Sequence, residues 1–210
     1  TPASHPLLAW LAIVFILGWM AFIALFPLCG ALPDRGYAIA KPVGIAIFSW
    51  LCWVLASTHL IPFSRLQAFI VFIALLLAVT AIFARHRRAI LAYLKEKWHL
   101  LVGLEVLFLT VLAFFLIVRA YHPNAIWGEK PMNYSFINAT YRADTFPPED
   151  PWISGHHINY YYYGQAVYSI VGKTIGVPPE YLFNIGGVTV TALVAVAIFG
   201  LAFALCRKTF

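Results

Sequence analysis

The chain has 210 residues, of which 62% are hydrophobic and 10% are charged. Charged residues make up about 25% of soluble domains, so this composition excludes an ordinary soluble globular fold. Apolar runs of about 18–25 residues recur, which is the length a helix needs to cross roughly 30 Å of hydrocarbon. The net charge of +6 is modest, and we interpret it as a topology signal and not as a nucleic-acid-binding patch. The sequence predicts an all-α, polytopic transmembrane helix bundle.

About five membrane spans are expected. Four of them fall in residues 1–120, residues 121–180 form a long loop with a juxtamembrane helix, and residues 181–210 hold the fifth span and a tail. A short amphipathic segment, which begins with Arg-His-Arg-Arg at 85–88, separates the third span from the fourth. The expected spans cover residues 7–28, 43–60, 66–84, 100–118 and 182–206.

The distribution of basic residues predicts the orientation of these spans. The link after the third span carries five Lys or Arg residues, whereas the link after the second carries only Arg65. Cytoplasmic links are enriched in Lys and Arg. We therefore expect a protein integral to the cytoplasmic membrane, with its N-terminus outside, its C-terminus inside and the long loop on the outer side.

The cysteines are too scattered to form a framework. Cys29, Cys52 and Cys206 lie in or beside expected spans, and the long loop has none. This pattern argues against structural disulfides and against a zinc site, which needs clustered ligands.

The stretch at 126–164 is where we expect function. It holds four of the eight acidic residues, two adjacent histidines and four consecutive tyrosines at 160–163. Loops of this length in a compact bundle usually have a function. The segment 160–175 is too short and polar to cross a membrane, and we expect an amphipathic helix on the outer interface there.

Four motifs carry a resemblance to a known family. LPDRGYAIAKP, EKPMNYSFINA, FPPEDPW and INYYYYG resemble motifs of the YYY membrane proteins of archaea and some bacteria, over about residues 32–204. The layout of that family is similar to the N-terminal part of the GT-C superfamily of glycosyltransferases. Family members are usually longer, so the chain resembles an N-terminal portion, and Asn133 stands where relatives often carry an acid.

The resemblance implies an inverting transfer of a sugar from a polyprenyl-phosphate-type donor at the outer face. Such a displacement needs a base to take the acceptor's hydroxyl proton, and a carboxylate can do this; Glu129 is the first candidate and Asp150 the second. The leaving phosphate needs cationic or hydrogen-bonding partners. The candidates for substrate or phosphate binding are Arg119, Lys130, Arg142, His156, His157, Tyr162 and Tyr163.

Each assignment has a plainer alternative. Glu129 and Lys130 can form a solvated turn, the two histidines a structural hydrogen bond, and the tyrosines an anchor in the headgroup region. No metal site is assigned, although a divalent metal bound by a histidine and Asp150 is left open. Glu105, an acid inside a span, is either functional, paired with Lys97 or His99, or protonated and hydrogen-bonded to a neighbouring helix.

Two functions compete. The leading hypothesis is a GT-C-like glycosyltransferase portion that uses a lipid-linked sugar. The alternative is a non-catalytic integral membrane subunit that scaffolds a larger complex. A transporter with Glu105 as its proton site is weaker, since inverted repeats are missing. Expected partners are membrane lipids, a polyprenyl-phosphate sugar and other membrane subunits, but no nucleic acid.

Overall fold

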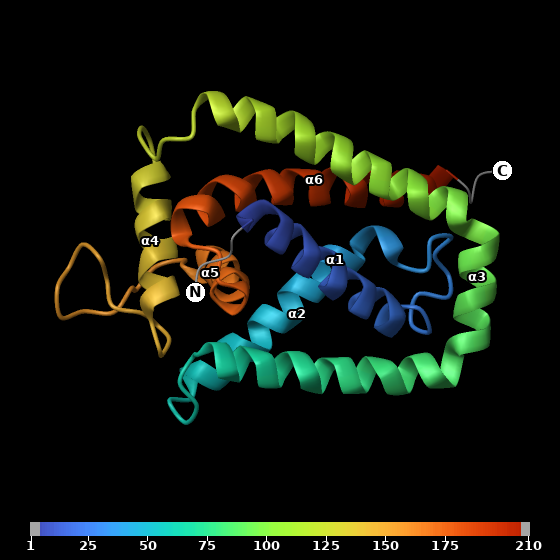
Figure 1. Ribbon diagram of the computed structural model, residues 1–210, viewed down its shortest axis with the longest axis horizontal. Coiled ribbons are helices and arrows are strands. Elements are labelled where there is room, and N and C mark those ends of the chain that lie inside the picture. The colour runs from blue at the N-terminus through green and yellow to red at the C-terminus, as the bar shows by residue number, and fades with distance from the viewer. Residues whose placement is uncertain (1–4, 207–210) are drawn as a thin grey trace.

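A computed structural model describes residues 5–206 and confirms the all-α prediction. Over these residues the chain forms six α-helices and no β-strand. In chain order they are α1 (Pro6–Leu25), α2 (Tyr37–Ser57), α3 (Arg65–Tyr121), α4 (Lys130–Arg142), α5 (Tyr163–Ile175) and α6 (Pro179–Cys206) (Figure 1).

Within the described residues, four helices (α1, α2, α3 and α6) are long and apolar enough to cross a membrane. The third and fourth expected spans belong to the same helix, α3, together with the amphipathic segment between them. Residues 65–121 contain no proline and a single glycine, Gly103, so nothing in the sequence breaks the helix. A straight helix of 57 residues would extend about 85 Å, but Figure 1 shows α3 bent back so that its first and last parts run in opposite directions.

The middle of α3 packs against the connection between α1 and α2. The Tyr93 hydroxyl donates a hydrogen bond to the carbonyl oxygen of Pro33 (3.1 Å). The Tyr93 ring meets that of Phe26 edge-on, with centroids 5.5 Å apart. The bend in α3 thus encloses this connection.

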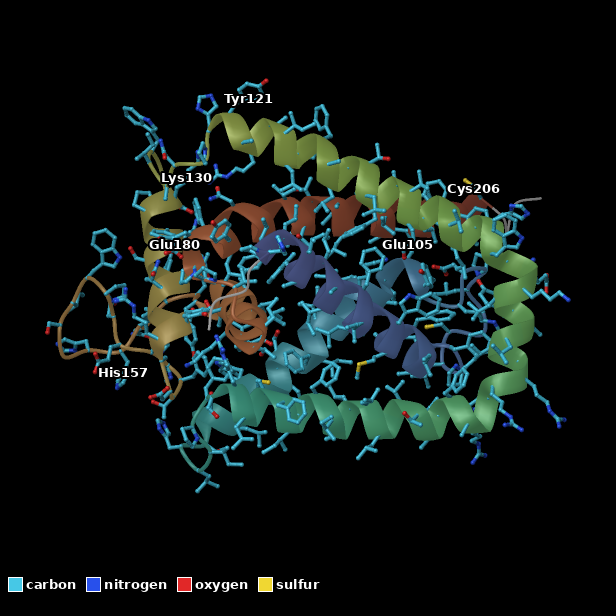
Figure 2. The ribbon with its side chains drawn as sticks, in the orientation of Figure 1. Glu105, Tyr121, Lys130, His157, Glu180 and Cys206 are labelled. Carbon is cyan, nitrogen blue, oxygen red and sulfur yellow. The ribbon has the colours of Figure 1, made fainter. Side chains whose placement is uncertain are left out.

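The molecule has two distinct ends (Figures 1 and 2). At the loop end lie α4, α5, the chain between them, the first residues of α1 and α6, the last residues of α2 and both ends of α3. At the basic end lie the connection between α1 and α2, the middle of α3 and the last turns of α6. Basic residues gather at this second end, namely Arg35, Arg85, Arg87, Arg88, Lys95 and Lys97.

The helices pack through a buried apolar core. Gly44 of α2 lies so close to α1 that a Cβ there would overlap the carbonyl oxygen of Leu17, which is the close helix approach that glycine permits in membranes. Trp10 of α1 donates its indole N–H to the Thr189 hydroxyl of α6 (2.9 Å), and both residues are buried.

The expected amphipathic segment at 160–175 contains α5. This helix lies at the loop end and packs against other helices of the protein. Ala166, Ile170 and Val171 are completely buried. α5 packs against α2, α4 and α6, so neighbouring helices cover much of its apolar face.

Candidate functional site: a lateral groove at the loop end

A groove lies between the end of α3 and the start of α6, and Lys130 of α4 borders it. We call it the lateral groove. Its cavity volume is about 420 Å³. Apolar side chains form much of its wall, and the basic residues Arg119 and Lys130 also line it; Figure 2 shows Lys130 at the start of α4. The lining residues are Phe115, Val118, Arg119, His122, Lys130, Phe183, Asn184, Gly187, Val188 and Thr191.

Arg119 is held in place by residues around it. Its Nε–H donates to the Asn184 Oδ1 of α6 (2.8 Å), and a terminal N–H donates to the carbonyl oxygen of His122 (2.9 Å). The guanidinium carbon lies 4.9 Å from the Phe183 ring centroid. The last turn of α3 therefore presents a positioned, permanently charged group to the groove.

Lys130 begins α4, and Glu129 precedes it. Trp127 and Gly128, at φ 71° and 60°, turn the chain into this helix. The Glu129 side chain is exposed and its Oε2 lies 3.5 Å from the Tyr161 hydroxyl. Lys130 lines the groove, whereas Glu129 does not. The structure thus places Arg119 and Lys130 at one groove. Glu129, the residue before Lys130, is not among the residues that line it.

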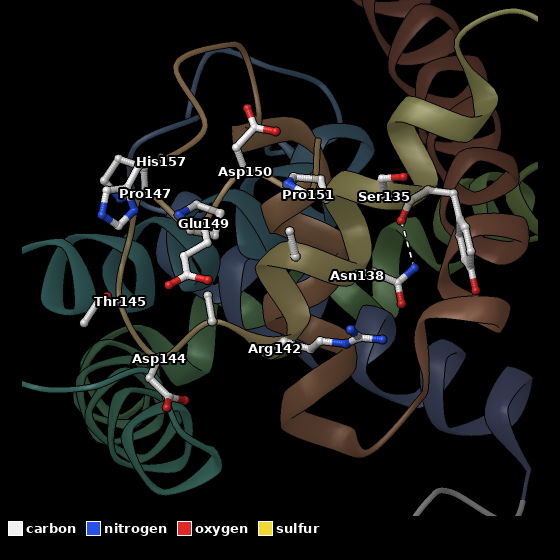
Figure 3. A pocket seen from close by; sticks show the side chains of 14 residues that line it. Ser135, Asn138, Arg142, Asp144, Thr145, Pro147, Glu149, Asp150, Pro151 and His157 are labelled. Carbon is white, nitrogen blue, oxygen red and sulfur yellow. Dashed lines mark hydrogen bonds between the residues drawn. The ribbon is translucent and has the colours of Figure 1, made fainter. Parts of the chain in front are cut away.

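A second cavity, of about 720 Å³, lies between α4 and the loop at 144–157. We call it the loop pocket. Figure 3 shows Arg142 on its α4 side, with the carboxylates of Asp144, Glu149 and Asp150 contributed by the loop. Arg142 and Asp150 therefore both border the loop pocket and not the lateral groove.

The loop pocket is bounded by a small hairpin. Glu149 and His157 form an isolated antiparallel bridge, and the Asp150 N–H donates to the carbonyl oxygen of His156 (2.8 Å). Asp150 Oδ1 accepts the N–H groups of Trp152 (2.8 Å) and Ile153 (3.2 Å). This carboxylate oxygen therefore stabilises a turn.

The two histidines are not brought to one site. His157 lines the loop pocket, whereas His156 does not. Across residues 5–206, no group of three or more His, Cys, Asp or Glu side chains is arranged to hold a metal ion.

The tyrosine run divides into two pairs. Tyr160 and Tyr161 are exposed, with ring centroids 4.1 Å apart. The Tyr162 hydroxyl accepts the indole N–H of Trp53 (3.0 Å), and the Tyr163 ring meets that indole at 5.5 Å. Partial burial raises the pKa of both Tyr162 and Tyr163. Neither lines the groove or the loop pocket.

Glu105 has different partners from those expected. It accepts a hydrogen bond from the Tyr37 hydroxyl (2.6 Å) and forms an ion pair with Lys41, both in α2. The predicted pairing with Lys97 or His99 is wrong, and Lys97 instead pairs with Glu96 (2.6 Å). Sequence reasoning missed Lys41 because the two residues lie 64 positions apart and because Lys41 was assigned to the link before the second expected span.

Sequence reasoning also missed Trp53 and Lys173. The Lys173 ammonium donates to the carbonyl oxygens of Ala143 (2.8 Å) and Phe63 (3.3 Å). It thereby joins α5 to two connecting segments. No local motif identifies such contacts, because they depend on how distant segments meet.

Comparison with known proteins agrees with the membrane assignment. A profile of the family described as "Uncharacterized membrane protein (DUF2298)" matches residues 47–210, which is most of the chain. No curated protein and no solved structure matches the chain. The apolar helices of the chain and the family match together identify an integral membrane protein. The chain belongs to the DUF2298 family of membrane proteins.

Proposed function

We propose that this protein is a GT-C-like glycosyltransferase portion, related to the YYY membrane proteins, that binds a polyprenyl-phosphate-linked sugar in the lateral groove. One observation carries the proposal. The groove combines apolar walls between two membrane-crossing helices with basic side chains at its loop end. A lipid-linked phosphate has the matching division, with an apolar chain and an anionic head.

The basic side chains suit a phosphate for two reasons. The Arg119 guanidinium is fixed by Asn184 and His122, so little side-chain entropy is lost when it binds an anion. Lys130 adds a second charge at the N-terminus of α4, where the helix dipole also favours anions.

The proposed reaction is a single displacement. An acceptor hydroxyl oxygen forms a bond to the anomeric carbon, and the bond from that carbon to the phosphate oxygen breaks. The phosphate leaves with the electron pair, and the carboxylate of Glu129 takes the hydroxyl proton. Arg119 and Lys130 stabilise the charge that develops on the leaving phosphate. Glu129 is favoured over Asp150 because an oxygen of Asp150 already holds two backbone N–H groups.

The donor site is tested by binding of a polyprenyl phosphate to the purified protein. Arg119→Gln should weaken binding about 10- to 100-fold, since a charge-assisted hydrogen bond contributes about 1.5–3 kcal/mol. Arg65→Gln removes an equal charge at the same end of the molecule, outside the groove, and should change binding little. Equal losses in the two variants would overturn the groove as the donor site.

The base is tested by transfer of the sugar to an acceptor. Glu129→Gln should lower turnover about 10²- to 10⁴-fold while lipid binding is kept. Unchanged turnover would remove Glu129 from the mechanism without affecting the binding proposal.

A second function, that of a non-catalytic subunit, is favoured by one observation. Among the residues that line the lateral groove there is no Asp or Glu, and Glu129 is exposed beside it. A scaffold that only binds a lipid phosphate needs no base. Retained lipid binding without any transfer, together with stoichiometric copurification of other membrane proteins, would favour this function.

A further inference from the structure

The basic end has two cavities of its own, and Tyr93 borders both. We call them the Tyr93 clefts. The first has a volume of about 440 Å³ and is bordered by the connection between α1 and α2, by α3 and by the last turns of α6. The second, of about 450 Å³, lies between Phe26, Pro27 and α3. Arg35, Tyr93 and Glu96 border both clefts.

Arg35 is positioned where the two clefts meet. Its backbone has φ 53°, a left-handed conformation that directs the turn before α2. The guanidinium carbon lies 5.2 Å from the Phe26 ring centroid. Because Phe26 also contacts the Tyr93 ring, the charged group and the apolar wall form one assembly.

The charges around these clefts are mostly positive. Arg35 borders both clefts, and Lys97 borders the first. The acidic residues are already engaged. Glu96 pairs with Lys97, and buried Asp34 accepts the N–H groups of Gly36 (3.1 Å) and Ala38 (2.8 Å). Three further arginines and a lysine on the middle of α3 add to the positive field, namely Arg85, Arg87, Arg88 and Lys95.

We propose that the Tyr93 clefts bind the headgroup phosphate of an anionic phospholipid from the leaflet at the basic end. Arg35 contacts the phosphate, and Lys97 supports it from the first cleft. The apolar walls formed by Phe26, Pro27 and the alanines of α3 accept the start of the acyl chains. Anionic lipids concentrate where juxtamembrane basic residues face the bilayer surface. This site lies at the opposite end of the molecule from the lateral groove and does not depend on the proposed transferase activity.

The test uses the purified protein in nanodiscs of phosphatidylcholine with increasing fractions of phosphatidylglycerol. Thermal unfolding and native mass spectrometry report bound phosphatidylglycerol. A basic residue near the membrane surface strengthens the binding of anionic lipid about fivefold wherever it stands. Lys95 lies outside both clefts, so Lys95→Gln measures this general loss of affinity. Arg35→Gln should weaken phosphatidylglycerol binding about tenfold or more, Lys97→Gln should also exceed the control, and Arg35→Lys should restore part of the loss.

Other results would overturn the proposal. Equal losses for Arg35→Gln, Lys97→Gln and Lys95→Gln would mean general attraction to the surface and no built site. A rise in the unfolding temperature caused by inorganic phosphate in pure phosphatidylcholine, equal to that caused by phosphatidylglycerol, would assign the clefts to a soluble anion. Lys97→Gln keeps the test valid if Arg35→Gln does not fold.

Discussion

Glu105 and Lys41 form an ion pair inside the helix bundle. The Lys41 residue is 8% exposed, and its ammonium lies 4.8 Å, 5.4 Å and 5.0 Å from the ring centroids of Phe15, Tyr37 and Phe108. Glu105 Oε2 is buried without a hydrogen-bond partner. A charge in such surroundings is stable only while it is paired.

Removal of one partner should therefore be more harmful than removal of both. Glu105→Leu leaves Lys41 buried and unpaired, and should cost about 3–5 kcal/mol of unfolding free energy. The double variant Lys41→Met with Glu105→Leu should recover most of this loss. Thermal unfolding in detergent of the single and double variants gives the coupling energy. If the two single losses simply add in the double variant, the pair does not stabilise the bundle.

Sequence reasoning at this scale identified residue types better than their partners. The isolated acid at 105 was found, but not the two α2 side chains that it contacts. Arg119 and Lys130 were both proposed as phosphate-binding residues, and they border the same groove. Arg142, Asp150 and His157 border another cavity, because the chain reverses direction between α4 and the hairpin. Spacing along the sequence does not predict such a separation.

At the scale of elements, the length of the apolar runs predicted most of the bundle. The long helix α3 was expected as separate segments, since the charges at 85–97 interrupt an apolar span. They do not interrupt a helix, because Arg, Lys, Glu and Ala are strong helix formers.

Close packing of α1 against α2 is a testable property of the bundle. Gly44→Ala should destabilise the protein by about 1–3 kcal/mol, since the new methyl group overlaps the α1 backbone at Leu17. Gly103→Ala is the matched control, because nothing lies within 4 Å of a Cβ there. It should be neutral or stabilise α3 by up to about 1 kcal/mol. Unfolding temperatures measured in one detergent compare the two, and equal effects would contradict the close approach.

Lys173 joins elements at the loop end. Besides its bonds to Ala143 and Phe63, its ammonium lies 3.5 Å from the Asp144 carboxylate and 4.6 Å from the Phe63 ring centroid. Burial lowers the pKa of Lys173, and Asp144 partly opposes that shift.

Loss of this lysine should loosen the segments that it joins. Lys173→Met keeps the apolar stem and removes the donor, so hydrogen exchange should quicken in residues 58–64 and 143–150. Lys95 is exposed on α3, so Lys95→Met is the control and should leave hydrogen exchange in both segments unchanged. Unaltered exchange in Lys173→Met would mean that α5 packing alone holds them.

At the scale of the whole molecule, the loop end and the basic end are separated along the bundle (Figure 2). The sequence predicted this polarity from the charge distribution, because the link rich in Lys and Arg and the acidic loop fall on opposite sides of the spans. From the positive-inside rule we predict that the basic end faces the cytoplasm.

This orientation is tested with a membrane-impermeant maleimide on intact cells. A cysteine introduced at Ser154, in the exposed loop, should be labelled from outside. One introduced at Lys95 should be labelled only after permeabilisation, with the unmodified protein as the blank. The reverse pattern would contradict the proposed topology. It would place the loop end, with Arg119 and Lys130 of the lateral groove, on the cytoplasmic side.

The central claim is that the lateral groove holds a lipid-linked phosphate. The most direct measurement is photo-crosslinking of the purified protein with a photoreactive polyprenyl phosphate, followed by peptide mapping. We expect crosslinks on the α3 and α6 walls near Phe115 and Phe183, reduced by excess unlabelled polyprenyl phosphate and by Arg119→Gln. Crosslinks confined to the loop pocket, or spread over all lipid-facing helices without competition, would contradict the account.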